Sequence, residues 1–253
     1  MTDHPLDGAR AKLERANENI ANLEREIAAF LELGNGVVIT QEDIEAFQKA
    51  LEFHESRIVP IKFSVMAGEV IHQLRSCLDH IAWQISSVDT RESSPTSIEF
   101  PIFLSKPSDP NTVASYERKV KGISPAVRDL IERIQPYQRD DRFALTGPPN
   151  DQLWIIHDFD RIDKHRELVL TVAAFRIEGA GQVEFFAHLY READFPERDI
   201  AGLSRTLDPN CEISPDVVFR DFGRRKMHPV IPGLSKLSRH VGKVIDAFER
   251  DCF

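Results

Sequence analysis

The stretch LDGARAKLERANENIANLEREIAAFL, residues 6–31, decides the fold class. Apolar side chains return in it every seven residues, and a second apolar series follows three residues behind the first. The two series are Leu6, Leu13, Ile20 and Ile27, and Ala9, Ala16, Leu23 and Phe30. Because charged residues fill most other positions, the pattern predicts a long helix with one apolar seam. That seam should pack on another helix of the chain or on a second subunit.

Helical patterns return further along the chain. The expected helices cover residues 44–56, 64–88, 124–135, one or two parts of 151–175, and 232–248. The first of these follows glycines at 33–36 that suit a helix end and a capping-box pattern at 40–43. In the region 151–175, the residues Ile155, Phe159, Ile162 and Val169 fall on one stripe, which indicates that helix continues into LVLTVAAF.

A change of pattern follows Gly179. QVEFFAHLY (182–190) and SPDVVFRDF (214–222) resemble strands joined by a long connection rich in Pro and Asp. The predicted fold is mainly α, of the α+β kind. It is a helical bundle with a long N-terminal heptad helix and a small antiparallel β element before the C-terminal helix. We expect one domain over 1–253, with a helical part at 1–178, the β element at about 180–222 and a closing helix at about 232–249.

Composition narrows the class of protein. A chain of 253 residues with 42% hydrophobic content can bury a substantial core. Its three cysteines are scattered without CxxC spacing, and the acidic start lacks the pattern of a secretion signal. No apolar run approaches the ~20 residues of a membrane helix. We therefore expect a cytoplasmic protein without membrane contact. The net charge of −9 argues against a general coating of nucleic acid, and no DNA-binding signature is visible.

The central helix carries a polar arc opposite its core face. At about 100° per residue, one side gathers the apolar residues, and Arg75 lies at the edge of the other. The polar arc consists of Glu69, His72, Ser76, Asp79, His80 and Trp83. Such an arc is often only a solvated face, in which Arg75 and Asp79 form an ordinary i, i+4 ion pair. It can equally be a site, because it offers two histidines, two carboxylates and a hydroxyl together.

The spacing Arg75-x-x-x-x-His80 resembles the R-x(4–6)-H motif of the HEPN family, small helical domains that include prokaryotic toxins and antiviral ribonucleases. The resemblance implies metal-independent RNA cleavage in which the 2′-hydroxyl attacks its own phosphodiester. It also implies a homodimer whose site the two chains share. His80 would transfer the proton and Arg75 would hold the phosphate, with Asp79 orienting one of them. The wider set of motifs, GEVIHQLRSCLDHIAW, EFPIF, IQPYQ and IDKHREL, is similar to a group of uncharacterised bacterial and phage proteins.

A second charged cluster, HDFDRIDKHR, spans residues 157–166. It can again be a solvated helix face with ion pairs. Alternatively, Lys164, His165 and Arg166 form a basic wall that grips phosphate opposite Arg75 and His80. In that case the DKHR segment lies against the polar arc of the central helix, where His72 and Ser76 also contact substrate.

Three functional classes remain open from the sequence. The first is a HEPN-like ribonuclease, in a toxin or phage-defence role. The second is a non-catalytic helical module that dimerises through residues 6–31 and binds a nucleotide or a protein. The third is a metal-dependent hydrolase with ligands from two helices, drawn from His72, Asp79, His80, His157, Asp163 and His165. Because no HExxH, phosphate-binding loop or GxSxG motif is present, neither a cofactor nor a compact metal motif is predicted.

Overall fold

The computed structural model describes residues 4–32, 58–139, 148–179, 182–187, 212–220 and 228–253. The expected helix at 44–56, with the caps before it, lies outside the described residues. The α-helices of the described part are α1 (Asp7–Glu32), α3 (Ile61–Ile85), α4 (Val88–Ser93), α5 (Pro110–Lys119), α6 (Pro125–Arg133), α7 (Gln152–Asp163) and α9 (Val230–Cys252). The strands are β1 (Leu170–Gly179), β2 (Gln182–Ala187), β3 (Glu212–Phe219) and β4 (His228–Pro229).

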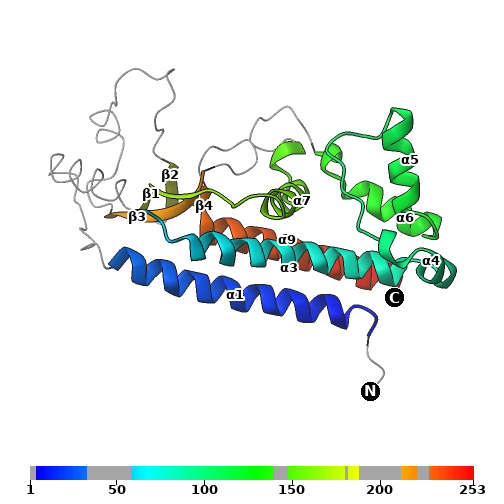
Figure 1. Cartoon of the computed structure of the whole chain (residues 1–253), viewed down its shortest axis with the longest axis horizontal. Helices are drawn as coiled ribbons and strands as arrows, with labels where there is room; N and C mark the ends of the chain where they lie inside the picture. Colours follow the sequence, from blue (N-terminus) through cyan, green and yellow to red (C-terminus); the bar gives the residue numbers. More distant parts are fainter. Residues whose placement is uncertain (1–3, 33–57, 140–147, 180–181, 188–211, 221–227) are drawn as a thin grey trace.

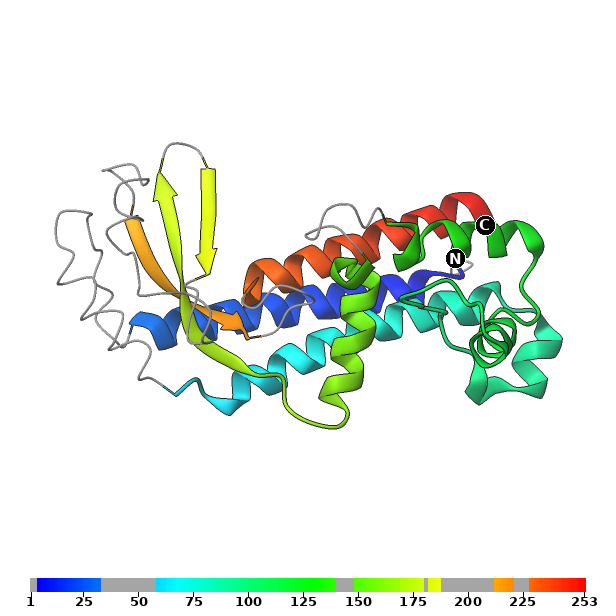
Figure 2. The same cartoon turned by 90° about the horizontal axis from the view of Figure 1, so that it is seen from above.

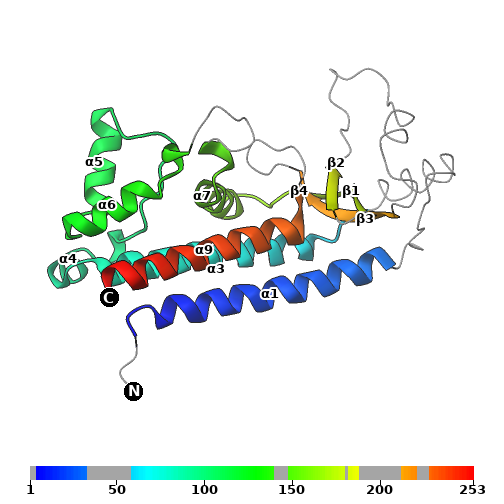
Figure 3. The same ribbon diagram turned by 180° about the vertical axis from the view of Figure 1, so that it is seen from behind.

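Three long helices, α1, α3 and α9, lie side by side and form the body of the molecule (Figures 1 and 3). Helix α7 crosses α3 and α9 (Figure 2). The small sheet lies at one end of the long helices, and α4, α5 and α6 gather at the other end (Figure 1). The prediction of a mainly helical bundle with a small antiparallel sheet before the last helix is confirmed. In the described part, no helix is both long and apolar enough to cross a membrane.

The heptad seam of α1 is buried inside the chain. Leu6, Leu23 and Ile27 are at most 4% exposed, because α1 packs along α3 and also contacts α9. Of the two partners that the sequence left open, the seam therefore uses helices of its own chain. The homodimer stays a prediction, and it would need another surface. Light scattering at micromolar concentration checks it.

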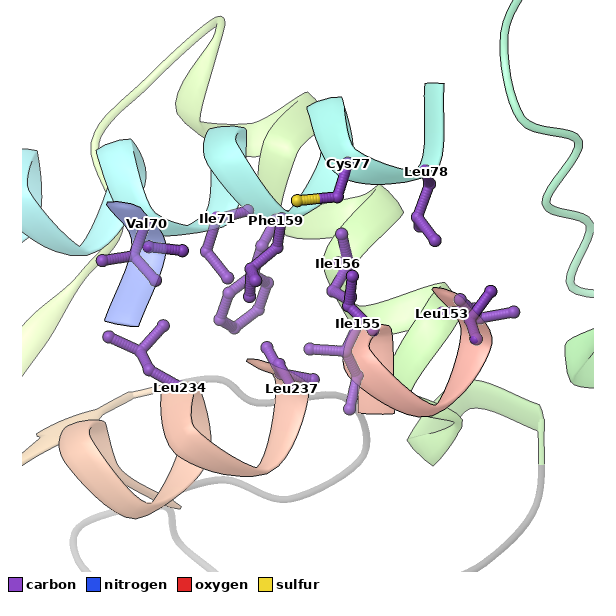
Figure 4. Close-up of a cluster of buried hydrophobic side chains, with 14 of the residues drawn as sticks. Val70, Ile71, Cys77, Leu78, Leu153, Ile155, Ile156, Phe159, Leu234 and Leu237 are labelled. Carbon is purple, nitrogen blue, oxygen red and sulfur yellow. The ribbon is translucent and has the colours of Figure 1, made fainter. Parts of the chain in front are cut away.

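A cluster of buried apolar side chains lies where α3, α7 and α9 meet (Figure 4). The labelled side chains there are Val70, Ile71, Cys77, Leu78, Leu153, Ile155, Ile156, Phe159, Leu234 and Leu237. The predicted closing helix is α9, and its apolar residues Leu234, Val241 and Phe248 are fully buried. Burial among these groups raises the pKa of the Cys77 thiol to about 12, so this cysteine is unreactive at neutral pH.

The expectation that helix continues through LVLTVAAF is wrong. Helix α7 ends at Asp163, and β1 begins at Leu170, so the β element starts before residue 180. Val169, which was placed on the buried stripe, is 53% exposed. The β-branched residues of this run favour a strand, and β1 pairs antiparallel with both β2 and β3. The sheet order is β2-β1-β3-β4.

Two short helices occupy the region that the sequence analysis left without regular structure. Helix α4 begins after Ser87, whose side chain accepts a hydrogen bond from the backbone N–H of Thr90. Helix α5 begins after Asp109, whose carboxylate accepts from the backbone of Asn111 and Thr112, with Pro110 at the first helical position. Between them EFPIF (99–103) is neither helix nor strand and crosses over α3.

Candidate functional site

Arg75 and Asp79 of α3 both bind the backbone of Phe100. Arg75 Nη2 donates to the Phe100 carbonyl at 3.1 Å, and Asp79 Oδ1 accepts from the Phe100 N–H at 2.8 Å. The two side chains also pair with each other at 3.1 Å. Phe100 in turn packs its ring edge-on against Phe248 of α9, with ring centroids 5.8 Å apart. This arginine and aspartate therefore fix the EFPIF segment to the bundle.

Arg75 is the buried centre of a partly buried group of charges, which we call the Arg75 cluster: Arg75, Asp79, Glu99, Lys119 and His157. Arg75 is only 4% exposed, so the expectation that it lies off the core is wrong. Its Nη2 lies 3.6 Å from Glu99 Oε2, and Lys119 Nζ lies 2.8 Å from Glu99 Oε1. Burial opposes ionisation of Glu99, but these two cations outweigh it and lower its pKa. Arg75 Nη1 is buried without a hydrogen-bond partner among the described residues.

His80 faces a different element from Arg75. Its ring lies against Gly8 of α1, where an added Cβ would come within 3.0 Å of Nδ1. Burial and the nearby charge of Lys12 lower the pKa of His80, and Asp79 opposes this only in part. Within one chain, therefore, the structure does not bring Arg75 and His80 to a common point. Arg75 binds the EFPIF segment, whereas His80 packs on the first helix.

His157 of α7 lies near the charges of Arg75 and Lys119. Burial lowers its pKa to about 4, and the positive charges of Arg75 and Lys119 add to the effect. Its ring also lies beside Trp154, with centroids 5.5 Å apart. Neither Glu99 nor Lys119 was predicted as a member of this cluster. They come from a loop and from a helix that was not expected, so sequence spacing did not place them beside Arg75.

Lowering the pH from 7 toward 4.5 should weaken folding through His157. Its pKa is about 4 in the folded protein and about 6.5 in an unfolded chain, so the unfolded state takes up the proton first. The stability from neutral His157 is complete above about pH 6.5 and is lost as the pH falls through the interval to 4. Because the ring is only half-buried, we expect an effect of about 2 kcal/mol.

Urea unfolding at pH 7.5 and 4.5 measures this effect. The loss of unfolding free energy between the two pH values should be smaller in His157→Gln than in the wild type. The matched control is His165→Gln, which changes an exposed histidine and should keep the wild-type loss. His80 and His240 also have lowered pKa values and act in the same direction, so only the difference between variants reports on His157.

A groove of about 580 Å³ lies between α1, the N-terminal half of α3 and the turn that follows α7. We call it the α1–α3 groove. Most of its lining residues are polar, and the charged ones carry both signs of charge. The lining residues are Arg15, Asn19, Ser64, Val65, Glu69, His72, Gln73, Asp163, Arg166 and Glu167. A concave surface with several convergent polar groups is where a ligand site is expected.

His72 is the best-oriented side chain of this groove. Its Nδ1 lies 3.1 Å from Oδ1 of Asp160, a carboxylate on α7 that is 5% exposed. Lys164 Nζ binds the other oxygen of the same carboxylate at 2.6 Å. The imidazole itself is 61% exposed. A buried carboxylate thus fixes the ring through one nitrogen and leaves Nε2 available on the exposed side.

Asp163 enters the same groove directly over Gly68. A Cβ at position 68 would overlap the Asp163 carboxylate, so the absence of a side chain there is what lets the carboxylate rest on α3. Burial raises the pKa of Asp163, and the neighbouring carboxylates of Asp160 and Glu69 raise it further, while His72 opposes them.

The predicted substrate-binding residues thus divide into two groups. His72 and Arg166 line the α1–α3 groove, and Lys164 reaches it through Asp160. Ser76 and His165 do not belong to its lining. The DKHR segment does lie against α3, but its partners are Gly68 and His72, nearer the start of the helix. In the described residues, no hydrogen bond or ion pair joins Lys164, His165 or Arg166 to Arg75, Asp79 or His80.

The six candidate metal ligands do not gather in one place. His72 and Asp163 line the groove, and His80 lies against α1. Asp79 and His157 belong to the Arg75 cluster, and His165 is exposed outside the groove lining. Over the described ranges, no three His, Cys, Asp or Glu side chains are arranged to hold a metal ion.

Comparison of this chain with models of protein families, with curated proteins and with solved structures finds no match. The resemblance to HEPN ribonucleases accordingly stays a prediction that rests on the Arg75 and His80 spacing. The chemistry of this chain has to be argued from the α1–α3 groove and the Arg75 cluster themselves.

Proposed function

We propose that this protein cleaves RNA without a metal ion, with His72 as the residue that accepts the proton of the ribose 2′-hydroxyl. The observation that carries the proposal is the contact of His72 Nδ1 with the buried Asp160 carboxylate. An ionised carboxylate can only accept a hydrogen bond, so the proton of a neutral imidazole stays on Nδ1. Nε2 is then the nitrogen that can accept a proton, which is what a general base in RNA cleavage has to do.

Cations around the groove support a phosphodiester substrate. Arg15 and Arg166 line the groove, and their guanidinium groups suit paired hydrogen bonds to phosphate oxygens. Lys164 binds Asp160, the carboxylate that also contacts His72. The proposal keeps the reaction that the HEPN resemblance implies, but transfers the proton-accepting role from His80 to His72, because His80 is turned toward α1.

Incubation of the purified protein with single-stranded RNA in EDTA tests the proposed activity. We expect fragments with 2′,3′-cyclic phosphate and 5′-hydroxyl ends, because attack by the neighbouring 2′-hydroxyl leaves those ends. RNA methylated at the 2′-oxygens should remain intact. Cleavage that needs added divalent metal would favour a metal-dependent hydrolase. A wild-type protein that binds RNA, nucleotide or protein but cleaves no RNA would favour the binding module.

A further inference from the structure

We infer that Asp163 is the second catalytic residue of the α1–α3 groove, the acid that protonates the departing 5′-oxygen while His72 accepts the 2′-proton. The inference rests on the proposed RNA cleavage and adds a residue to it. It also explains why a groove that binds phosphate contains carboxylates, which would otherwise repel the substrate.

The position of Asp163 in the groove supports this role. Asp163 and His72 line the same groove, and each comes from a fixed place: the last residue of α7 and the middle of α3. Glycine inside a helix is destabilising relative to alanine, so a glycine at position 68 of α3 needs a structural explanation. In this fold the Asp163 carboxylate occupies the space where a side chain at position 68 would lie.

The surroundings of Asp163 also suit a proton donor. Asp163 is half-buried and lies near two other carboxylates, Asp160 and Glu69, so its surroundings favour the protonated form and raise its pKa. Asp160 contacts His72 through Nδ1 and leaves Nε2 free to accept a proton. One group that can donate a proton and one that can accept it, in the same groove, can act as the acid and the base of one reaction.

The proposed step conserves atoms and charge. His72 Nε2 takes the proton from the 2′-hydroxyl while a bond forms between the 2′-oxygen and phosphorus. The bond between phosphorus and the 5′-oxygen breaks, and the proton of the Asp163 carboxyl goes to that oxygen. The products are a 2′,3′-cyclic phosphate and a 5′-hydroxyl. His72 is left protonated and Asp163 ionised, and exchange of one proton with water restores both.

A substrate with sulfur in place of the bridging 5′-oxygen separates an acid from a structural residue. A thiolate leaves without protonation, because a thiol is a far stronger acid than an alcohol. We expect Asp163→Asn to cleave ordinary RNA about 10²–10⁴-fold more slowly than wild type. On the sulfur substrate its rate should be close to that of the wild type. His72→Ala should be slow on both substrates.

Equal losses by Asp163→Asn on the two substrates would overturn the acid role of Asp163. So would rescue of His72→Ala, rather than Asp163→Asn, by sulfur. Both results would leave the proposed RNA cleavage standing. Failure of the proposed function is recognised separately, as wild-type protein that cuts neither substrate.

Gly68→Ala tests the position of Asp163 without changing any ionisable group. The new methyl must displace the Asp163 carboxylate, so cleavage of ordinary RNA should fall as in Asp163→Asn, and sulfur should restore it. The matched control is Gly242→Ala in α9, where the nearest atom to an added Cβ is Leu13 Cδ2 at 3.5 Å. This control should behave as wild type. Full activity of Gly68→Ala on ordinary RNA would contradict the inference.

Discussion

Alanine at His72 is expected to slow RNA cleavage about 10²–10⁴-fold, the usual contribution of a proton-transfer group, whereas alanine at His80 leaves the rate close to wild type. The difference follows from where the two rings point. His72 is 61% exposed, lines the α1–α3 groove and is oriented by a buried carboxylate. His80 packs on Gly8 of α1, near the charge of Lys12, and does not line that groove. Initial rates on one RNA, in EDTA, measure both variants.

The rates of the two variants can be compared only if both variants are folded to the same extent as the wild type. His72→Ala removes an exposed side chain and should leave the melting temperature nearly unchanged. Asp160→Asn is the intermediate case, because an amide keeps a hydrogen bond to His72 but no longer fixes which ring nitrogen carries the proton. We expect it to lose less activity than His72→Ala and to alter the pH–rate profile. An inactive His80→Ala beside an active His72→Ala would return proton transfer to His80.

The helical part of the fold could be predicted because its signal is local and long. The seven-residue repeat of α1 and the stripe of α9 extend over many turns, and both stripes are buried as their patterns indicate. The strand β1 could not be predicted in the same way. Its apolar run is short, and short apolar runs fit a buried helix and a strand equally well. Pairing with β2 and β3, which come later in the chain, decides the matter.

The polar arc of α3 is not one surface. His72 faces the α1–α3 groove, Asp79 binds the EFPIF segment with the buried Arg75, and His80 faces α1. Helical spacing gives the angle between side chains on one helix, and it gives nothing about the elements that cover each angle. Three different elements cover this arc, so residues that share an arc in sequence have three separate surroundings.

Helical spacing also could not give the partner of His72. Asp160 is in the second charged cluster that the sequence singled out, and it is the most deeply buried charged residue of that cluster. Its importance comes from α7 crossing α3, a contact between residues 88 positions apart. Gly68 did carry a signal, since a glycine inside a well-patterned helix is costly. That signal indicates a close neighbour at this point of α3, although it does not name Asp163.

Methionine at Arg75 is expected to lower the free energy of unfolding by about 3 kcal/mol, because breaking a buried ion pair leaves the other charge uncompensated. The side chain is only 4% exposed, and its loss would free the Phe100 carbonyl and leave Asp79 and Glu99 facing each other. For a chain of this size the melting temperature should fall by roughly 6–12 °C. Urea unfolding and thermal melting measure the change.

The matched control is Arg161→Met, which removes an exposed helical arginine whose pair with Asp158 is open to water. Such a pair contributes at most about 1 kcal/mol, so this variant should melt near wild type. Arg75→Met should still cleave RNA at a temperature where it is folded, since its guanidinium holds the EFPIF segment rather than the α1–α3 groove. A stable but inactive Arg75→Met protein would reverse this assignment: it would give Arg75 a direct role at the phosphate, as the HEPN resemblance implies, and would separate the reaction from the groove around His72.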